Sequence, residues 1–452
     1  IVEQSEVSDG PSQIIYTTTN GQIVTPVNNA TFGANIVSNV YENGQGVITF
    51  DGPATAMTWG AFQNCTTLKT VTIPGSITNW EAYIFDGCTN LTTVTILDGV
   101  KSLGWGTFEQ CTKLTDVVMP ESVTTIESYA FSGCDALKTI TFPDNLTTIG
   151  EGAFYDCQLL SGVVIPNSVT SLGEKVFAIC PNIGSFSGKF ATSDGKSLID
   201  GDTLLAIAPL GMTSYNIPEG IKTIGMETFG STTLEAITMP NSVTTIRELA
   251  FSYSMINNIT LSENLETIEE RAFEWCQNLQ RITIPNNVTT IGDWVFSECP
   301  SLQEITGKFA SDDNRCLIVD GRLVAFAPVG TSTCNIPQGV TTIGPGVFMG
   351  CSDLVSVTIP EGVTSIGLSA FNRCTSLEEV TLPSTLTTLG NYAFYYCTSV
   401  AGFYCKASTP PSVGTQALNG QTSARRIYVP TASVDAYKAA EGWSSFASTI
   451  IG

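Results

Sequence analysis

The chain has 452 residues, and its 41 Asp and Glu against 19 Lys and Arg give a formal net charge of -22 at neutral pH. This charge repels phosphate backbones and anionic headgroups, so we expect neither nucleic acid nor a membrane surface as a partner. Histidine is absent, which removes the commonest general base and the usual zinc ligand, so we expect no enzymatic activity, no metal and no cofactor.

Residues 1–45 lack the repeat that fills most of the chain and are predicted to form an N-terminal cap. They contain strand and turn signals such as Ile14-Ile15-Tyr16 and Asn20-Gly21. Residues 1–11 lack the basic and apolar regions of a signal peptide, and no apolar run approaches the roughly 20 residues of a transmembrane helix, so we expect no membrane insertion. A start without Met favours removal of an export or lipid-anchoring segment, although an arbitrary start point would look the same.

From residue 46 to residue 405 one phrase recurs, L-x-x-V-x-I-P-x-x-V-T-x-I-G-x-x-A-F-x-x-C, and it is clearest in residues 137–157. Its phenylalanine returns at an interval of 23 residues (85 − 62 and 108 − 85). A fixed period of this length is the signature of a solenoid, in which each coil contacts only its neighbours. The repeat phenylalanines that have a cysteine three residues later are Phe62, Phe85, Phe108, Phe131, Phe154, Phe177, Phe273, Phe296, Phe348, Phe371 and Phe394, and Phe229 and Phe251 hold the same position in two coils without this cysteine.

Each coil offers two extended segments, L-x-x-V-x-I-P and V-T-x-I-G, in which alternating apolar and small polar residues give one buried face. The proline ends the first segment because it has no N–H to donate to a strand ladder. Val47–Phe50 reads as the first strand of this type, and A-F-x-x-C is short enough for a single turn of helix. Because the repeats are in register, we predict parallel ladders in a mainly β, curved, right-handed solenoid.

Two insertions interrupt the period, at about residues 187–215 and 306–334. In each, consecutive repeat phenylalanines are 52 positions apart (229 − 177 and 348 − 296), which is one coil of 23 plus 29. The two insertions are related at an offset of 119, since Gly188–Ala191 recurs as Gly307–Ala310. Asp200-Gly201 and Asp320-Gly321 lie between apolar runs, so a β-hairpin is predicted in each insertion.

Residues 406–452 are predicted to form a C-terminal cap. Arg425–Pro430 repeats the strand motif once more, and Val434–Lys438 begins an amphipathic helix that we expect to extend through Trp443 and Phe446. Solenoids need such end covers to hide the last core layer and the open sheet edge.

Eleven of the 14 cysteines share one repeat position, three residues after the phenylalanine. Equivalent side chains of adjacent coils lie about 4.8 Å apart and point the same way, whereas a disulfide needs Cβ atoms about 3.8 Å apart that face each other. We therefore predict free, buried thiols that act as small hydrophobes. Thr232 and Ser254 replace the thiol in two coils, as packing allows. A bridge between Cys316 and Cys334, outside this position, stays open.

The phrase I-P-x-S-V-T-x-I-G-x-x-A-F-x-x-C, as in Ile165–Thr170, resembles the BspA-like leucine-rich repeat family. The opening Ile15–Gly21 and the endings Ile427–Pro430 and Ala436–Ala440 look like the ends of such proteins in Bacteroides relatives. The resemblance implies a leucine-rich-repeat solenoid on a secreted or bacterial cell-surface protein, and members of the family adhere to host proteins, other bacteria or host cells. It carries no catalytic motif and no ligand that could be transferred.

A first candidate site lies on the sheet of first strands, which we expect to be concave, because residues that depart from the repeat mark sites on a solenoid. Most outward positions of this sheet hold Thr, as β-propensity explains. The departures are Asp116, Arg281, Glu304, Glu379 and Tyr404. Scattered charges for solubility are the alternative interpretation.

A second candidate site lies in the turns around each phenylalanine, where large aromatic residues replace small or polar ones. Exposed aromatic residues are typical anchors for binding partners, and local packing between coils is the alternative. Trp80 is excluded because it occupies the buried Ile position of V-T-x-I-G, so we expect it in the core. The turn residues are Trp59, Trp105, Tyr129, Tyr155, Trp275, Trp294, Tyr395 and Tyr396.

Acidic residues near the hairpins, such as Asp194, Asp313 and Asn314, hint at Ca²⁺, but turn formation explains them equally well. We therefore predict a monomeric, non-catalytic surface or secreted protein that binds an extracellular protein, with a glycan-binding or structural surface component as the alternative. A protein ligand predicts mutational sensitivity at the sheet charges, and a glycan predicts it at the turn aromatics.

Overall fold

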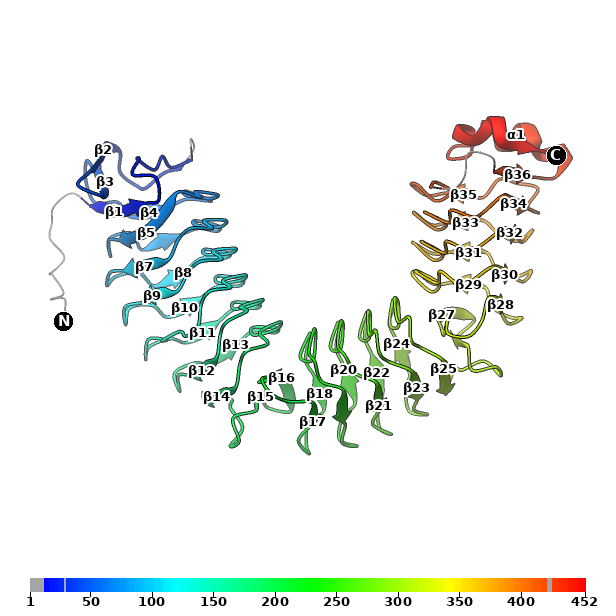
Figure 1. Cartoon of the computed structure of the whole chain (residues 1–452), viewed down its shortest axis with the longest axis horizontal. Coiled ribbons are helices and arrows are strands. Elements are labelled where there is room, and N and C mark those ends of the chain that lie inside the picture. Colours follow the sequence, from blue (N-terminus) through cyan, green and yellow to red (C-terminus); the bar gives the residue numbers. More distant parts are fainter. Residues whose placement is uncertain (1–11, 28–29, 421–424) are drawn as a thin grey trace. The chain divides into compact units, whose positions relative to one another are not determined.

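The computed structural model describes residues 12–27, 30–420 and 425–452, and the chain forms two compact units, Ile1–Gly211 (unit 1) and Met212–Gly452 (unit 2). Both units are stacks of coils with parallel strands and little helix (Figure 1). The predicted β-solenoid with coils of about 23 residues is confirmed. The boundary after Gly211 falls inside the first predicted insertion.

Unit 1 begins with an antiparallel cap made of β1 (Gln13–Thr18), β2 (Ile36–Glu42) and β3 (Gln45–Phe50). The strand order β2-β3-β1-β5-β7-β9 places β1 between β3 and the first coil strand, β5 (Leu68–Ile73). Val47–Phe50 was expected to be the first strand of the parallel ladder, and this expectation is corrected. The segment lies in β3 and pairs antiparallel with β1 and β2.

The coils of unit 1 pair in parallel with the register that the repeat demands. Thr70 of β5 lies opposite Thr93, which lies opposite Asp116, each 23 residues further on. The other long strands are β7 (Thr93–Ile96), β9 (Asp116–Val118), β12 (Gly162–Ile165) and β14 (Ser185–Gly188). The short strands are β4 (Ala56–Met57), β6 (Asn79–Trp80), β8 (Ser102–Leu103), β10 (Thr125–Ile126), β11 (Thr148–Ile149) and β13 (Ser171–Leu172).

The coil with the clearest motif departs from the expected strand pattern. Residues 137–142 form no strand, although Ile140 and Phe142 are still buried. Phe142 occupies the position that Ile96 and Ile165 hold in sister coils, and its ring packs edge-on against Phe154 at 5.6 Å. We attribute the local loss of ladder pairing to this larger side chain.

Both predicted hairpins are present. In unit 1, β15 (Ser197–Asp200) pairs antiparallel with β16 (Thr203–Ile207) across Gly201. In unit 2, β26 (Cys316–Val319) pairs antiparallel with β27 (Arg322–Phe326) across Asp320 and Gly321.

Unit 2 repeats the same coil architecture. Its long strands are β17 (Ser214–Asn216), β19 (Ala236–Thr238), β21 (Asn258–Thr260), β23 (Arg281–Ile284), β25 (Glu304–Gly307), β28 (Thr333–Asn335), β30 (Ser356–Thr358), β32 (Glu379–Leu382), β34 (Gly402–Cys405) and β36 (Arg426–Tyr428), and the two-residue β37 (Ile450–Ile451) pairs with β36. Its short strands are β18 (Thr223–Ile224), β20 (Thr245–Ile246), β22 (Thr267–Ile268), β24 (Thr290–Ile291), β29 (Thr342–Ile343), β31 (Ser365–Ile366), β33 (Thr388–Leu389) and β35 (Ser412–Val413).

The C-terminal cap contains the predicted final strand, β36, followed by helix. The α-helix is shorter than expected: α1 (Val434–Ala439) follows the 3-10 turn η1 (Thr431–Ser433), and the residues around Phe446 form the 3-10 helix η2 (Ser444–Thr449). Gly442, with a φ of 79°, separates α1 from η2. Trp443 is fully buried, so the cap still covers the last coil.

The turn that contains each phenylalanine is a chain of tight turns instead of the single helical turn we expected. The second residue before the phenylalanine and the second residue after it both have positive φ, as in Tyr83 (60°) and Gly87 (69°) around Phe85. The N–H groups of Tyr83 and Phe85 donate to carbonyl oxygens of the next coil, whereas the N–H of Cys88 closes a turn onto Phe85. Because every second N–H group of the turn donates to the next coil, the hydrogen bonds of a helix cannot form within the turn.

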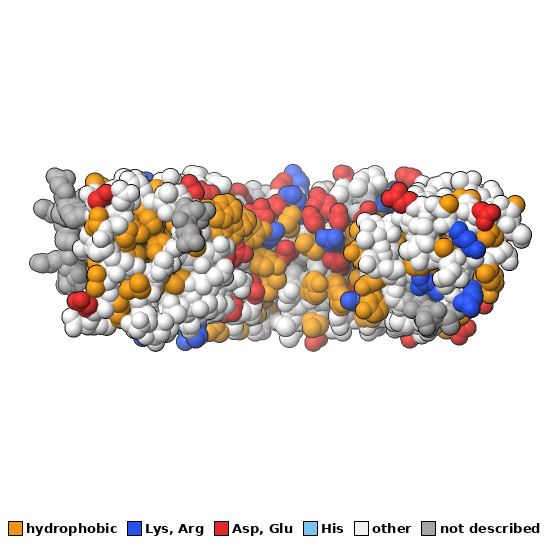
Figure 2. All heavy atoms as spheres, turned by 90° about the horizontal axis from the view of Figure 1, so that it is seen from above, with side chains coloured by type: hydrophobic (Ala, Val, Ile, Leu, Met, Phe, Trp, Pro, Cys, Tyr) orange, Lys and Arg blue, Asp and Glu red, His pale blue; other side chains and the backbone are white. Residues whose placement is uncertain are grey.

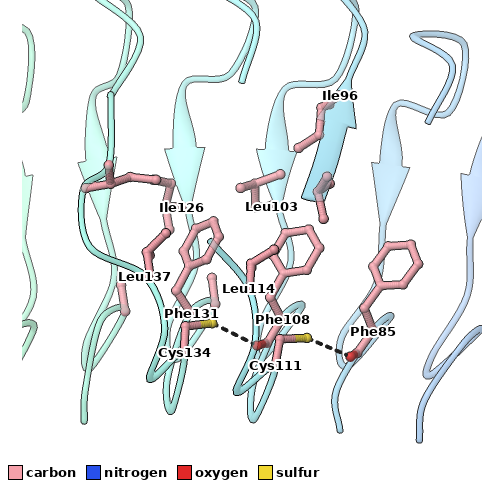
Figure 3. Packing of buried hydrophobic residues seen from close by; sticks show 14 of the residues in the cluster. Phe85, Ile96, Leu103, Phe108, Cys111, Leu114, Ile126, Phe131, Cys134 and Leu137 are labelled. Carbon is pink, nitrogen blue, oxygen red and sulfur yellow. Dashed lines mark hydrogen bonds between the residues drawn. The ribbon is translucent and has the colours of Figure 1, made fainter. Parts of the chain in front are cut away.

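The core of each unit is a stack of identical side chains, one from each coil. Phe85, Phe108 and Phe131 stack with ring centroids 5.5 and 5.2 Å apart, beneath leucine and isoleucine side chains of the two strands (Figure 3). The cysteine of one coil points at the phenylalanine carbonyl of the previous coil: Cys134 Sγ lies 3.3 Å from Phe108 O. All 14 cysteines are free.

Burial raises the pKa of the Cys351 thiol and of the Cys405 thiol to about 12. Cys316 and Cys334 are also free and buried, so no bridge joins them, although their thiols are close enough to share a hydrogen bond.

Candidate binding surfaces

Four aromatic residues of unit 1 form a continuous row across four successive turns, which we call the aromatic strip: Trp59, Tyr83, Trp105 and Tyr129. Their ring centroids lie 4.9 Å apart for Trp59–Tyr83, 4.6 Å for Tyr83–Trp105 and 5.6 Å for Trp105–Tyr129. The structure therefore brings together three of the predicted turn residues and adds Tyr83, which sequence reasoning missed.

Glycines in alternate coils make room for the rings of this strip. The position two residues before the phenylalanine alternates between Tyr83, Gly106, Tyr129 and Gly152, and all four have positive φ. A Cβ atom at Gly106 would lie 2.9 Å from the Tyr83 ring, and one at Gly152 would lie 2.6 Å from the Tyr129 ring. This alternation of glycine with a large residue, visible at an interval of 46 residues, was the sequence signal that could have identified Tyr83.

The strip remains accessible even though its rings pack on each other. Trp59 is 59% exposed and Trp105 is 39% exposed, whereas Tyr83 and Tyr129 are half-buried between them. Packing between coils therefore accounts for the two tyrosines but leaves the indole faces open. Figure 2 shows hydrophobic side chains gathered over unit 1, in the left part of the view, with acidic side chains at their margin.

Carboxylates border the strip. Glu81 Oε2 accepts the backbone N–H of Trp59 at 2.9 Å. Glu109 lies beside Tyr83, since a Cβ at Gly106 would be 3.0 Å from its Oε2. Partial burial, and then the nearby charge of Asp86, raise the pKa of the Glu109 carboxyl. Burial and the charges of Glu109 and Asp86 raise the pKa of Tyr83, so this edge of unit 1 has a negative potential.

A basic side chain occupies the far end of the strip. Lys175 Nζ lies 5.5 Å from the centroid of the Tyr129 ring and 3.1 Å from Glu151 Oε1. Tyr129 also donates its hydroxyl to Glu151 Oε1 at 3.1 Å. Burial lowers the pKa of Lys175, but its contacts with Tyr129 and Glu151 outweigh this and raise the pKa overall. The ammonium group is thus held between an aromatic face and a carboxylate.

The other predicted turn residues do not join the strip. Tyr155 lies one residue after Phe154, at a different turn position, and is half-buried. In unit 2, Trp275 stacks on Tyr253 with centroids 5.6 Å apart, and Arg271 lies 5.7 Å from the Trp294 ring. Tyr395 contacts Tyr392 at 5.3 Å and Tyr396 at 4.6 Å in a separate cluster.

The predicted sheet residues of unit 2 form two pairs. Arg281 on β23 and Glu304 on β25 form an ion pair of 3.0 Å across adjacent strands. Tyr404 on β34 donates its hydroxyl to Glu379 Oε1 at 3.2 Å, and its ring stacks on Tyr428 at 4.6 Å. These charges therefore largely satisfy one another on their own sheet.

Asp116, the predicted sheet residue of unit 1, is exposed on β9 and accepts the hydroxyl of Thr115 at 2.7 Å. In Figure 1 the phenylalanine turns run along the inner side of the curve of unit 1, and the strands extend from there toward its outer side. The long-strand sheet does not line the inner side, so our expectation of a concave sheet is corrected. The turns, and not the strands, form that side.

Trp80 lies in the core as predicted, 6% exposed, with its indole N–H donated to the Ile77 carbonyl. Asp194 and Asp313 each accept hydrogen bonds within their own turns, from the N–H groups of Lys196 and Arg315. Within the described ranges, no three His, Cys, Asp or Glu side chains lie together as metal ligands. None of the helices in the described part of the chain has the length and apolar character that a bilayer crossing needs.

The fold and the exposed turn surface define a β-solenoid repeat protein that presents side chains from successive coils. The family model described as "BspA type Leucine rich repeat region (6 copies)" matches residues 48–187, 209–312 and 324–438. This chain belongs to the BspA-type leucine-rich repeat family, as its motifs indicated. No curated protein sequence matches it.

Several solved structures are similar at low identity. A leucine-rich cell surface protein of Faecalibacterium prausnitzii is 24% identical, with 78% of this chain and 95% of that chain covered and a TM-score of 0.47. The pneumococcal vaccine antigen PcpA is 20% identical, with 80% of each chain covered and a TM-score of 0.49. A leucine-rich-repeat protein of Bacteroides ovatus is 22% identical, with 95% of each chain covered and a TM-score of 0.39.

Proposed function

We propose that this protein is a non-catalytic binding protein, secreted or held at a bacterial cell surface, that acts as a monomer and attaches to an extracellular protein. The observation that carries the proposal is the exposed aromatic strip, with Trp59 and Trp105 open to solvent above half-buried tyrosines. Tryptophan and tyrosine are enriched among the residues that dominate binding energy in protein interfaces. Because the rings of Trp59 and Trp105 already pack against Tyr83, they lose little side-chain freedom on binding.

The sheet residues Asp116, Arg281, Glu304, Glu379 and Tyr404 are proposed as secondary contacts. Exposed ion pairs such as Arg281–Glu304 contribute about 0–1 kcal/mol, and a partner would have to compete with the existing pair. The strip has no such internal competition at its two tryptophans, so we assign it the larger share of binding.

Glycan binding is the second candidate function, because the C–H faces of sugar rings also stack on exposed indoles. Because it uses the same strip, mutational sensitivity at the turn aromatics does not distinguish a glycan from a protein ligand, contrary to our expectation from the sequence, and the partner itself has to be identified. A structural role in the cell surface would use neither the strip nor the sheet residues.

The test is binding of immobilised full-length chain to a panel of extracellular matrix proteins and of glycans. The Trp59→Ala/Trp105→Ala variant is compared with an Arg281→Ala/Glu304→Ala variant. We expect saturable binding to a protein that falls at least tenfold in the tryptophan variant and changes little in the ion-pair variant. Binding to glycans alone supports the second candidate, and no binding in either panel refutes the proposal.

A further inference from the structure

The far end of the aromatic strip already binds a cation from its own chain. Lys175 lies over Tyr129 and pairs with Glu151, as described above. Unit 2 has the same arrangement: Arg271 lies over Trp294, with its Nε 3.6 Å from Glu270 and 3.9 Å from Glu274. The turn positions of this solenoid therefore hold basic side chains between an aromatic face and carboxylates.

The near end of the strip, formed by Trp59, Tyr83 and Trp105, also combines aromatic rings with carboxylates, but it has no such cation. Among the described residues, no Lys or Arg lies over Trp59, Tyr83 or Trp105, and no ion pair neutralises Glu81 or Glu109. The more exposed rings are at this end, with Trp59 at 59%. A neutral sugar can donate hydroxyl hydrogen bonds to these carboxylates but gains no net charge attraction, whereas a cation gains both charge attraction and ring contact.

We propose that the near end of the strip binds a basic, extended segment of the partner protein, with Lys or Arg side chains on Trp59 and Trp105 and their charges met by Glu81 and Glu109. The inference rests on the proposed function and specifies its partner chemistry. It also agrees with the net charge of -22, which attracts basic partners.

The spacing suits such a segment. Trp59 and Trp105 are two coils apart, which is about 9.6 Å at the usual strand separation of about 4.8 Å. An extended polyproline-type chain rises about 3.1 Å per residue, so basic residues three positions apart are separated by about 9.3 Å. A repeat of one basic residue in every three therefore places a side chain over each indole.

The experiment titrates the full-length protein with a synthetic peptide in which Arg recurs every third residue between Pro and Ser. Tryptophan fluorescence and calorimetry follow binding at low and high NaCl concentrations. A peptide with Glu in place of Arg is the charge control. We expect the Arg peptide to bind, more weakly at high salt, and the Glu peptide not to bind.

Two strip variants separate ring contact from charge. Trp59→Ala/Trp105→Ala is expected to weaken the Arg peptide about 5- to 30-fold, from two exposed cation–π contacts. Glu81→Gln/Glu109→Gln preserves the rings and is expected to weaken binding and flatten its salt dependence. A Leu97→Ala/Leu159→Ala variant, at exposed residues of unit 1 outside the strip, is the matched control and should bind as the wild type does.

The proposal is overturned if the Arg peptide does not bind, if the Glu peptide binds equally, or if the charge variant binds as the wild type does. It is also overturned if a β-1,4-glucan oligosaccharide, titrated in parallel, binds in place of the peptide and loses affinity in the tryptophan variant. If the Arg peptide does not bind but a matrix protein binds in a way that depends on the strip, only the proposal of a basic partner segment is refuted. Absence of binding in every assay would refute the proposed function as well.

Discussion

At the residue scale, the recurring cysteine does more than fill space. The carbonyl oxygen of Phe108 accepts the N–H of Cys111 from its own coil at 3.1 Å and the thiol of Cys134 from the next coil at 3.3 Å. The thiol thus occupies the second lone pair of a buried carbonyl and ties adjacent coils together. The two residues that replace the thiol make different contacts: the Thr232 hydroxyl donates to Phe229 O of its own coil at 2.8 Å, and Ser254 contacts the thiol of Cys276 at 3.5 Å.

This role predicts different results for two substitutions at Cys134. Cys134→Ala removes both the sulfur contacts and the donor, and we expect a loss of about 1–3 kcal/mol in the free energy of unfolding. Cys134→Ser keeps a donor for Phe108 O, so it should recover part of that loss. Urea unfolding monitored by circular dichroism measures both. A serine variant no more stable than the alanine variant would mean that the thiol acts through packing alone.

At the element scale, the phenylalanine turn shows what a periodic sequence can and cannot predict. The interval of 23 residues predicts parallel, in-register strands, because equivalent residues must lie opposite each other in adjacent coils. It does not predict the turn conformation, since helical and left-handed turns of this length place the phenylalanine equally well in the core. The aromatic strip depends on that conformation, so Trp59, Trp105 and Tyr129 were identified but Tyr83 was not.

The interlock between Gly106 and the Tyr83 ring gives a prediction for the strip. The alanine of Gly106→Ala must adopt a φ near 58° and displace the Tyr83 ring. We therefore expect its melting temperature to fall by more than the left-handed backbone conformation alone would cause. Gly201→Ala is the matched control, because Gly201 has a φ of 60° but no atom within 4 Å of its Cβ position. The left-handed conformation costs each variant about 1–2 kcal/mol. Equal melting temperatures for the two would show that the ring contact contributes nothing.

At the scale of the whole molecule, the division into two units is the feature the sequence did not predict. The two insertions are alike in sequence, yet the boundary after Gly211 falls in the first, whereas the second lies inside unit 2. No linker rich in Pro, Ser or charge marks the boundary. The antiparallel cap strand β3 was missed for a related reason: Val47–Phe50 has the composition of a coil strand, and only its pairing with β1 distinguishes it.

The stacking of the coils also predicts how far a destabilising substitution in one cap affects the rest of unit 2. Trp443 in the C-terminal cap is fully buried, donates its indole N–H to Pro411 O at 2.7 Å and packs edge-on against Tyr437 at 4.9 Å. Trp443→Ala removes this packing, and substitutions of this kind cost about 3–5 kcal/mol. Because each coil contacts only its neighbours, the loss should loosen the last coils and fade along the stack. Hydrogen exchange of the full-length variant should therefore lose protection in β35 and β36 and retain it in β29 and β31. A uniform loss of protection throughout unit 2 would instead show that its coils open together, as in a globular domain with a single core.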